Sequence, residues 1–94
     1  MKRLYVLINK ELDSVYGAVQ GGHAVAQYLI DTSCKKWNNE YLIYVIADLS
    51  IWKQKLEMLD INCSIFYEPD LDNMMTAIAV EHNGNLFKKL ELLK

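Results

Sequence analysis

The sequence predicts a single α/β domain in which about four strands form a mixed, mostly parallel sheet with helices packed on it. Three observations lead to this fold class. Two continuous apolar runs, residues 4–8 and 41–47, have the composition of strands that are buried on both faces. A long segment with helical periodicity, residues 14–30, lies between them. A strand, a helix and a second strand in this order favour a right-handed crossover and a parallel strand pair.

Length and composition exclude several classes of protein. The chain has 94 residues, of which 52% are hydrophobic and 23% charged, so residues 1–94 are expected to form one core and not two. The formal net charge of −2 gives no general attraction to phosphate, so contact with nucleic acid requires a local basic patch. No apolar run reaches the roughly 18 residues of a membrane helix. We therefore expect a cytoplasmic protein with no membrane partner.

Residues 14–30, SVYGAVQGGHAVAQYLI, form the expected long helix, which Asp13 or Ser14 caps and which ends near residue 31. Helical spacing separates its residues into three stripes. The stripe expected to face the core is apolar and contains Val15, Ala18, Val19, Gly22, Ala26, Leu29 and Ile30. A polar stripe along its edge contains Tyr16, Gln20, His23 and Gln27.

The third stripe of this helix carries almost no side chain. It contains Gly17, Gly21 and Ala24. Glycine costs about 0.8–1 kcal/mol relative to alanine in a helix interior, so glycines here need a structural reason. We expect another backbone or a bulky ligand to lie close against this stripe.

A second helix and a third strand are expected next. The helix runs from residue 49 to about 60, with residues 48–50 as its cap, since leucine and tryptophan recur there at helical spacing. The strand covers residues 62–67 and stops at Glu68, because Pro69 cannot donate to a strand ladder.

The last part of the chain is expected to begin with a fourth strand, residues 75–80. Its alternation places Thr76, Ile78 and Val80 on one face. Asn83-Gly84 indicates a turn. The tail that follows has two interpretations, helix or strand, and we expect a short helix first and an extended end after it.

Four polar side chains are the candidates for chemistry. His23 has an ordinary pKa of about 6.5, which suits proton transfer at neutral pH, although a helix-surface histidine with a structural hydrogen bond is equally compatible with the sequence. Glu68 ends a strand, and in open α/β sheets ligands bind at the carboxyl ends of parallel strands. If the third strand runs in the direction of the first, Glu68 and the polar stripe share one cleft. Gln20 and Thr76 are then placed to join them, although each also fits its local structure without any function.

Other kinds of site have less support. The acidic residues Glu68, Asp70 and Asp72 lack the full spacing of a calcium loop, so no metal site is expected. Cys34 and Cys63 form no CxxC pair, which indicates reduced thiols, and no base for a cysteine nucleophile is evident. The sequence has no P-loop, GxGxxG or GxSxG motif. No cofactor is therefore expected.

Two segments resemble the type II peptidyl-tRNA hydrolases. AVQGGHA, residues 18–24, is similar to the AAQxxHA helix of that family, and FYEPDLDNMMTAIAV, residues 66–80, is similar to its later segment, especially in short relatives that carry EPDL. The order of elements also resembles the small α/β domain of the family. The resemblance covers nearly the whole chain, but its specific part is these two motifs.

The resemblance implies roles for particular residues. Gln20 and His23 match the helix motif, Glu68 matches a strand-ending aspartate, and Thr76 matches a threonine. The chain departs from the family at Tyr16, which replaces a lysine, and at the loop PDLDNMM, which replaces a longer loop with glycine, arginine and proline. Both changes remove groups suited to phosphate, although tyrosine can still stack on a base.

The implied activity is metal-independent hydrolysis of the ester between a peptide and the 3′ ribose of tRNA. His23, Glu68 and Thr76 are the implied catalytic residues, and Tyr16 and Gln20 are expected to bind the substrate. Four lysines are candidates for contact with the tRNA backbone, although solvated helix ends explain them equally well: Lys35, Lys36, Lys53 and Lys55. The alternatives are action on another small ester or amide, and an inactive homologue that binds a partner. Under the binding alternative, the stripe of Gly17, Gly21 and Ala24 is expected to contact a partner, most simply a second copy across a two-fold axis. The resemblance to a dimeric family implies a homodimer in either case.

Overall fold

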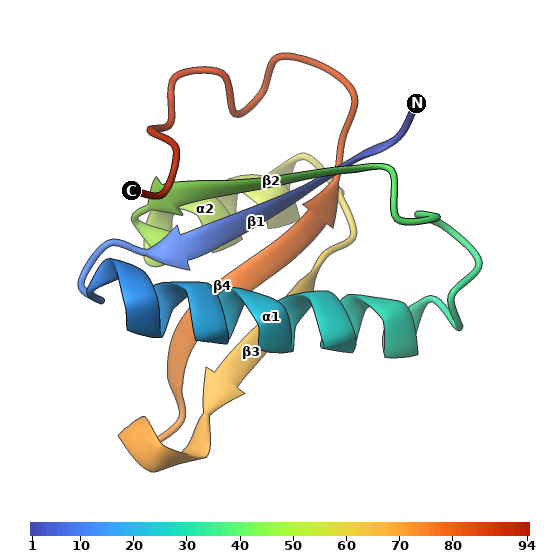
Figure 1. Ribbon diagram of the computed structural model, residues 1–94. Coiled ribbons are helices and arrows are strands. Elements are labelled where there is room, and N and C mark those ends of the chain that lie inside the picture. The colour runs from blue at the N-terminus through green and yellow to red at the C-terminus, as the bar shows by residue number, and fades with distance from the viewer.

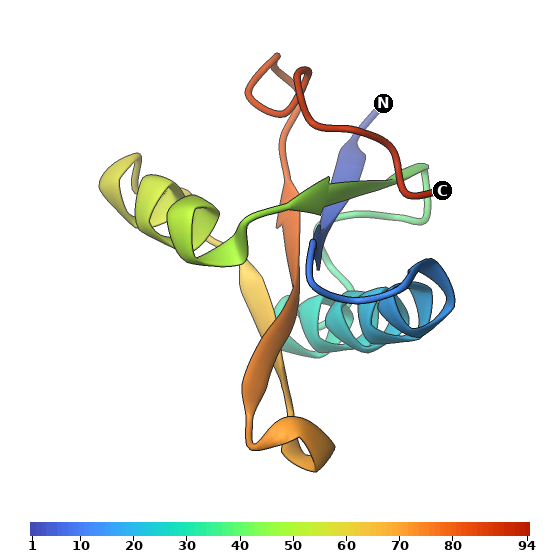
Figure 2. The same ribbon diagram turned by 90° about the vertical axis from the view of Figure 1, so that its left-hand side faces the viewer.

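A computed structural model describes all residues, 1–94, and shows one four-stranded sheet with a helix on each face (Figure 1). Figure 2 shows the two helices on opposite sides of the sheet. The elements are β1 (Arg3–Asn9), α1 (Ser14–Asp31), β2 (Tyr41–Ala47), α2 (Leu49–Met58), β3 (Ser64–Glu68), the 3-10 turn η1 (Pro69–Leu71) and β4 (Met74–Glu81). The strand order across the sheet is β2-β1-β4-β3.

The sheet is mixed, but the expectation that it is mostly parallel is wrong. Only β1 and β2 pair in parallel, whereas β4 is antiparallel to both β1 and β3. The physical reason is the short connection through η1, because a tight turn joins antiparallel neighbours and a parallel pair needs a long crossover. Since β3 and β1 are both antiparallel to β4, they run in the same direction. Glu68 therefore lies at the end of the sheet where α1 begins.

The bounds of α1 agree with the expected helix, but the side that it buries is different. Asp13 is the cap, and its carboxylate accepts a hydrogen bond from the Tyr16 N–H at 2.9 Å. The buried residues are Gly17, Gln20, Gly21, Ala24 and Tyr28. The apolar stripe expected to face the core points mostly to solvent, and Val15 is 79%, Val19 55% and Ile30 70% exposed.

Two bulky side chains of the sheet explain this reversal. A Cβ placed on Gly17 would lie 2.6 Å from Ile8 Cγ2, and one on Gly21 would overlap the Tyr44 ring. The helix therefore rests on the sheet through residues with almost no side chain. The predicted close approach at the glycine stripe is confirmed, but the neighbour is the sheet of the same chain. This correction removes the stripe as a contact between two copies of the protein.

The opposite face of the sheet packs against α2. Asp48 caps this helix and accepts from the Ile51 N–H at 3.4 Å. Leu49 and Leu56 are buried in one cluster with Val45, and Trp52 packs against it. The helix ends at Met58, slightly before the expected end near residue 60.

The tail does not form the short helix that we expected. Phe87 is 1% exposed and lies 4.8 Å from the Tyr5 ring, so turns carry this phenyl group into the core beneath α2. The expected extended end is present, since Leu92 forms an antiparallel bridge with Val45. The Ile46 N–H donates to the Glu91 carbonyl at 2.8 Å. Backbone groups on the outer edge of β2 thus form hydrogen bonds that favour an extended conformation at the end of the tail. No helix in the protein is long and apolar enough to cross a membrane.

Adjacent glycines of α1 offer a matched test of this packing. We expect Gly21→Ala to destabilise the protein by about 1–3 kcal/mol, because the added methyl group overpacks the contact with Tyr44 and Ile8. Gly22→Ala meets no atom within 4 Å and should stabilise the protein by about 0.8–1 kcal/mol through helix propensity. Urea unfolding at low protein concentration measures both values. Equal stabilisation by the two changes would contradict the described packing.

Candidate functional site

The polar stripe of α1, the end of β3 and the start of β4 meet at one end of the sheet. They bring together the five residues that the sequence singled out: Tyr16, Gln20, His23, Glu68 and Thr76. Two of these side chains are buried and three reach the surface. The site therefore has an internal polar support and an outer part that solvent can enter.

The support is a chain of hydrogen bonds through Gln20. This side chain is 1% exposed, and its amide oxygen accepts from the Thr76 hydroxyl at 2.7 Å. Its amide nitrogen donates to Glu68 Oε1 at 2.9 Å. Because an ionised carboxylate can only accept, the NH₂ group must face Glu68 and the oxygen must face Thr76. The network thus fixes the orientation of the amide.

Thr76 reaches Gln20 because β4 has a bulge at this position. Phe66 pairs with Ala77 and Tyr67 pairs with Met75, so Thr76 is an extra residue between them. The expectation that Thr76 faces the same way as Ile78 and Val80 is wrong, since those two residues lie in the cluster beneath α2. A bulge reorients the side chain of the inserted residue. Here it turns the hydroxyl toward α1.

Glu68 is held as a carboxylate at the end of β3. The hydrogen bond from Gln20 lowers the pKa of this carboxyl below its ordinary value. A second hydrogen bond, from the Asp70 N–H at 3.3 Å, and the charge of His23 lower it further. The group is partly exposed and is therefore a negative charge at neutral pH that remains accessible from solvent.

His23 lies on the exposed side of this carboxylate. Its ring stacks on the Phe66 ring, with centroids 4.5 Å apart and planes inclined by 10°. It makes no hydrogen bond to Glu68, so the two side chains interact through charge, and both ring nitrogens remain free for a substrate. The role of Phe66 was missed from the sequence, where this residue is one of several apolar side chains of β3.

Tyr16 lies on the turn of α1 before Gln20. Desolvation raises the pKa of its phenol, and the negative charges of Glu68 and Asp70 raise it further. The hydroxyl therefore stays protonated at neutral pH and can donate a hydrogen bond. The lysine that the family resemblance implies at this position would instead add a positive charge.

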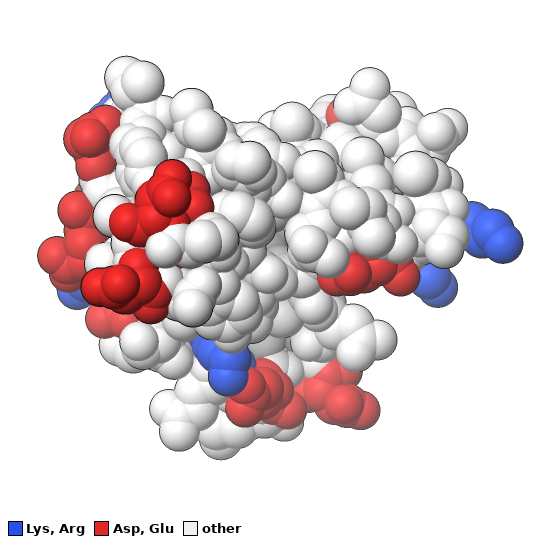
Figure 3. Space-filling model, turned by 90° about the horizontal axis from the view of Figure 1, so that it is seen from below, with Lys and Arg blue, Asp and Glu red and all other residues white.

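The surface around the site is acidic rather than basic. Figure 3 shows Asp and Glu atoms gathered on the side where η1 lies, with further acidic atoms and only a few scattered Lys and Arg atoms on the rest of this face. Lys53 donates to Glu57 at 2.8 Å, and Lys55 lies 4.7 Å from the centre of the Trp52 ring. Lys35 and Lys36 follow the far end of α1. None of these four lysines lines the candidate site.

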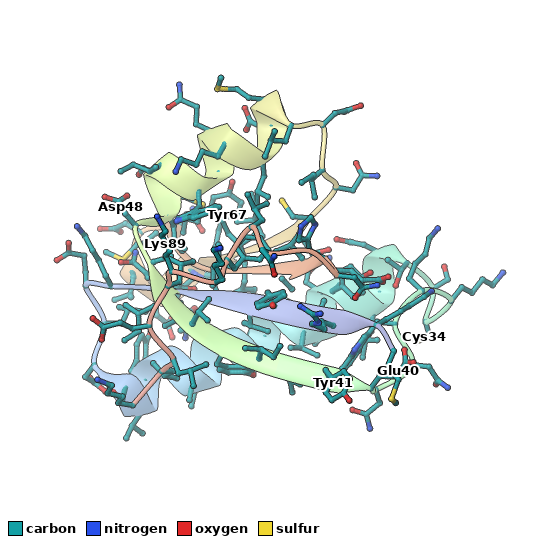
Figure 4. The ribbon with its side chains drawn as sticks, turned by 90° about the horizontal axis from the view of Figure 1, so that it is seen from above. Cys34, Glu40, Tyr41, Asp48, Tyr67 and Lys89 are labelled. Carbon is teal, nitrogen blue, oxygen red and sulfur yellow. The ribbon has the colours of Figure 1, made fainter.

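The remaining candidates do not join this site. Cys34 is exposed at the opposite end of the molecule from Asp48 (Figure 4). Burial raises the pKa of the half-buried Cys63 thiol, which disfavours the thiolate. No group of three or more His, Cys, Asp or Glu side chains is arranged to hold a metal ion.

A separate hollow of about 360 Å³ lies at the carboxyl ends of β1 and β2. The sequence predicted no functional residue in this region. Asn9 spans it by donating to the Met75 carbonyl at 2.9 Å, and Lys10 pairs with Asp48 at 3.5 Å. Asn9, Lys10 and Asp48 are therefore already paired within the hollow. The only sequence signal for this hollow is that Asn9 and Asp48 directly follow two predicted strands.

Comparison with known proteins adds no further assignment. No family model matches the chain, and no curated protein matches it significantly. The geometry of these side chains and the two motifs are therefore the basis for assigning a function.

Replacing Gln20 with leucine tests the hydrogen-bond network. Gln20→Leu removes the donor that most lowers the pKa of Glu68, so this pKa should rise toward its ordinary value of about 4.3. Loss of both buried hydrogen bonds should also cost about 1–3 kcal/mol of stability. NMR titration of the Glu68 carboxyl and urea unfolding measure the two effects.

Gln27→Leu is the matched control, because Gln27 lies on the same helix stripe but donates to Asp31 at 2.8 Å. It should leave the pKa of Glu68 unchanged. The sign of the pH effect follows from the lowered pKa. The contribution of Glu68 to stability is present above its unfolded pKa and is lost as the pH falls through its folded pKa. An unchanged titration of Glu68 in Gln20→Leu would contradict the network.

Proposed function

We propose that the protein is an ester hydrolase of the type II peptidyl-tRNA hydrolase kind, which cleaves the bond between a peptide and the 3′ ribose of tRNA. The observation that supports this proposal is the single cluster formed by Gln20, His23, Glu68 and Thr76. These four residues match the two family motifs, and as many as 56 positions in the sequence separate two of them, Gln20 and Thr76. Motif residues that are distant in the chain thus lie together, with Gln20 and Thr76 buried and His23 and Glu68 accessible to solvent.

In the proposed mechanism, His23 transfers the proton. Its ring is held flat against Phe66 and its nitrogens are free, so one nitrogen can take a proton from water while the water attacks the ester carbonyl. The nearby carboxylate of Glu68 stabilises the imidazolium that forms. The same imidazolium then donates its proton to the ribose oxygen as the bond to the carbonyl carbon breaks, so that the ribose leaves as a free hydroxyl.

Burial changes the roles that we propose for Gln20 and Thr76. Gln20 is 1% exposed and Thr76 is fully buried, so neither side chain reaches a substrate on the surface. We assign both as positioning residues that fix the carboxylate of Glu68. Tyr16 is partly exposed beside them and remains the residue proposed to bind the substrate, through its hydroxyl or by stacking.

The charges favour contact with the end of the tRNA rather than with its phosphate backbone. Glu68 and Asp70 place negative charge next to Tyr16, which disfavours phosphates there. From His23 to the end of α1 at Asp31 the helical rise gives a distance of about 12 Å, and Lys36 follows beyond that end. We therefore propose that the terminal nucleoside binds at Tyr16 and His23, and that backbone contacts are few.

A second function is favoured by a different observation. Several large apolar side chains on the outer side of α1 are exposed, as expected for a protein that binds a partner. Under this alternative the fold is kept and the reaction is lost. Incubation with a peptidyl-tRNA mimic separates the two functions, since the hydrolase releases the peptide whereas a binding protein leaves the ester intact.

Removal of the imidazole tests the proposed reaction. His23→Ala should lower the rate of hydrolysis of a peptidyl-tRNA mimic by about 10²–10⁴-fold, because the proton-transfer group is lost. The side chain is exposed, so the circular dichroism spectrum and the unfolding midpoint should change little. His82→Ala is the control, since His82 packs near Phe87 at 5.7 Å, in the cluster beneath α2.

Two results would contradict the proposed reaction. Equal rates for the wild type and His23→Ala would exclude His23 as the proton-transfer group. No hydrolysis by the folded wild type would exclude the enzyme and favour the binding protein.

A further inference from the structure

The strand β3 forms one edge of the sheet, and its outer side pairs with no other strand (Figure 1). The opposite edge, on β2, is closed by the tail of the chain, since Leu92 forms a bridge with Val45. No segment of the chain closes the edge at β3 in this way. An open strand edge is a template on which another extended chain can pair.

Two residues of β3 direct their backbone groups to this open edge. The Phe66 carbonyl faces β4, because it accepts from the Thr76 hydroxyl at 3.4 Å. Residues that bond to the neighbouring strand alternate with residues that do not, so the N–H and C=O groups of Ile65 and Tyr67 point outward. Met75, which pairs with Tyr67, accordingly turns its carbonyl toward β1.

These outward groups have no partner within the chain. The backbone hydrogen bonds made by turns and loops include none to Ile65 or Tyr67. The strand contains no lysine or proline that would block its edge, and the bulge lies on β4 instead. Tyr67 is 45% exposed, so an incoming chain can reach this part of the strand. The edge therefore offers unpaired donors and acceptors to an extended peptide.

The open edge leads directly to the candidate site. His23 stacks on Phe66, the residue between the two outward-facing positions. Glu68, the last residue of the same strand, is the carboxylate whose charge interacts with His23. A peptide that pairs with this edge therefore ends beside the groups proposed to act on its ester.

We propose that the peptide part of the substrate binds as an added strand along β3, through main-chain hydrogen bonds to Ile65 and Tyr67. This binding mode rests on the proposed hydrolysis of a peptidyl ester and names the part of that substrate that the protein recognises. Main-chain bonds do not depend on side chains, so peptides of many sequences are accepted. An ester of a single amino acid has too little backbone to form these bonds.

The position of the nucleoside determines the direction of the added strand. Tyr16, proposed to bind the nucleoside, lies near Glu68 and Asp70 at the carboxyl end of β3. The peptide leaves the ester in the opposite direction, toward Ile65, and its own carboxyl end is at the ester. It therefore runs parallel to β3. At about 3.3 Å per residue, the edge along residues 65–68 accommodates about three residues of peptide.

Esters of different peptide length test the added strand. The substrates are tRNA mimics that carry one, two, three or five residues with an acetylated amino end. For the wild type, kcat/KM should rise about 10-fold or more from one residue to three, because each main-chain hydrogen bond contributes a factor of about 2–10. It should then stay level from three residues to five, since the fourth and fifth residues lie beyond the open edge.

A matched pair of variants tests the contribution of one outward N–H group. Tyr67→Pro removes this donor without removing a bond to β4, and proline is tolerated at such an edge position. Tyr67→Ala loses the same side chain but keeps the N–H. Tyr67→Pro should hydrolyse the three-residue ester about 10-fold more slowly than Tyr67→Ala, and the one-residue ester at the same rate as Tyr67→Ala. Urea unfolding shows whether both variants are folded.

Amide hydrogen exchange tests the edge without any hydrolysis and without a variant. An acetylated tripeptide amide, added to the wild type at millimolar concentration, should slow the exchange of the Ile65 and Tyr67 N–H groups. The Phe66 N–H, which faces β4, should exchange at an unchanged rate. NMR spectroscopy resolves the three groups separately.

The results distinguish failure of the added strand from failure of the proposed function. Equal kcat/KM values for all peptide lengths, or equal rates of Tyr67→Pro and Tyr67→Ala on the three-residue ester, would overturn the added strand and leave the hydrolysis in place. No hydrolysis of any ester by the folded wild type would contradict the proposed function. In that case slowed exchange at Ile65 and Tyr67 would still support a peptide-binding edge, and unchanged exchange would overturn it.

Discussion

The side-chain amide of Gln20 is the contact on which the arrangement of the site depends. It is buried between α1 and the sheet, and it joins the Thr76 hydroxyl on β4 to the Glu68 carboxylate on β3. A buried amide without partners costs about 1–3 kcal/mol, so the helix has one favourable position on the sheet. In that position His23, one turn further along α1, lies beside Glu68. The internal hydrogen bonds thus determine the geometry of the exposed side chains.

This contact requires the helix to lie unusually close to the sheet. Glycines face Ile8 and Tyr44, and their missing side chains provide the space that these bulky groups occupy. The larger apolar residues of α1 are consequently displaced to its outer side. One steric constraint therefore explains both the position of the site and the exposure of apolar residues on the outer side of α1.

The elements of the fold were predictable from the sequence, but the side of α1 that is buried was not. Apolar runs, caps and Pro69 predicted the order of the elements and placed their bounds within about two residues of those in the structure. Hydrophobic periodicity failed for α1 because it assumes that the larger apolar residues point inward. Gly17 and Gly21 reverse that rule, and only the positions of Ile8 and Tyr44 in space reveal it. The short helix expected in the tail is absent because turns carry Phe87 into the core beneath α2, and this burial is not visible in the local sequence.

The residues of the site were also predictable from the sequence, but the hydrogen bonds and the ring stacking that join them were not. The helical spacing of Gln20 and His23 and the strand end at Glu68 indicated one shared cleft. The bulge at Thr76 has no sequence signal, yet it turns the hydroxyl that orients the amide. The stacking of His23 on Phe66 similarly depends on the position of β3 beside α1.

The most direct test of this account is a double-mutant cycle on the free energy of unfolding, with Gln20→Leu and Thr76→Val. These residues lie 56 positions apart and are joined by one hydrogen bond of 2.7 Å between buried groups. The account predicts a coupling of about 0.5–3 kcal/mol between the two changes. Effects that add to within about 0.3–0.5 kcal/mol would show that the amide does not join α1 to β4, and would contradict the central claim.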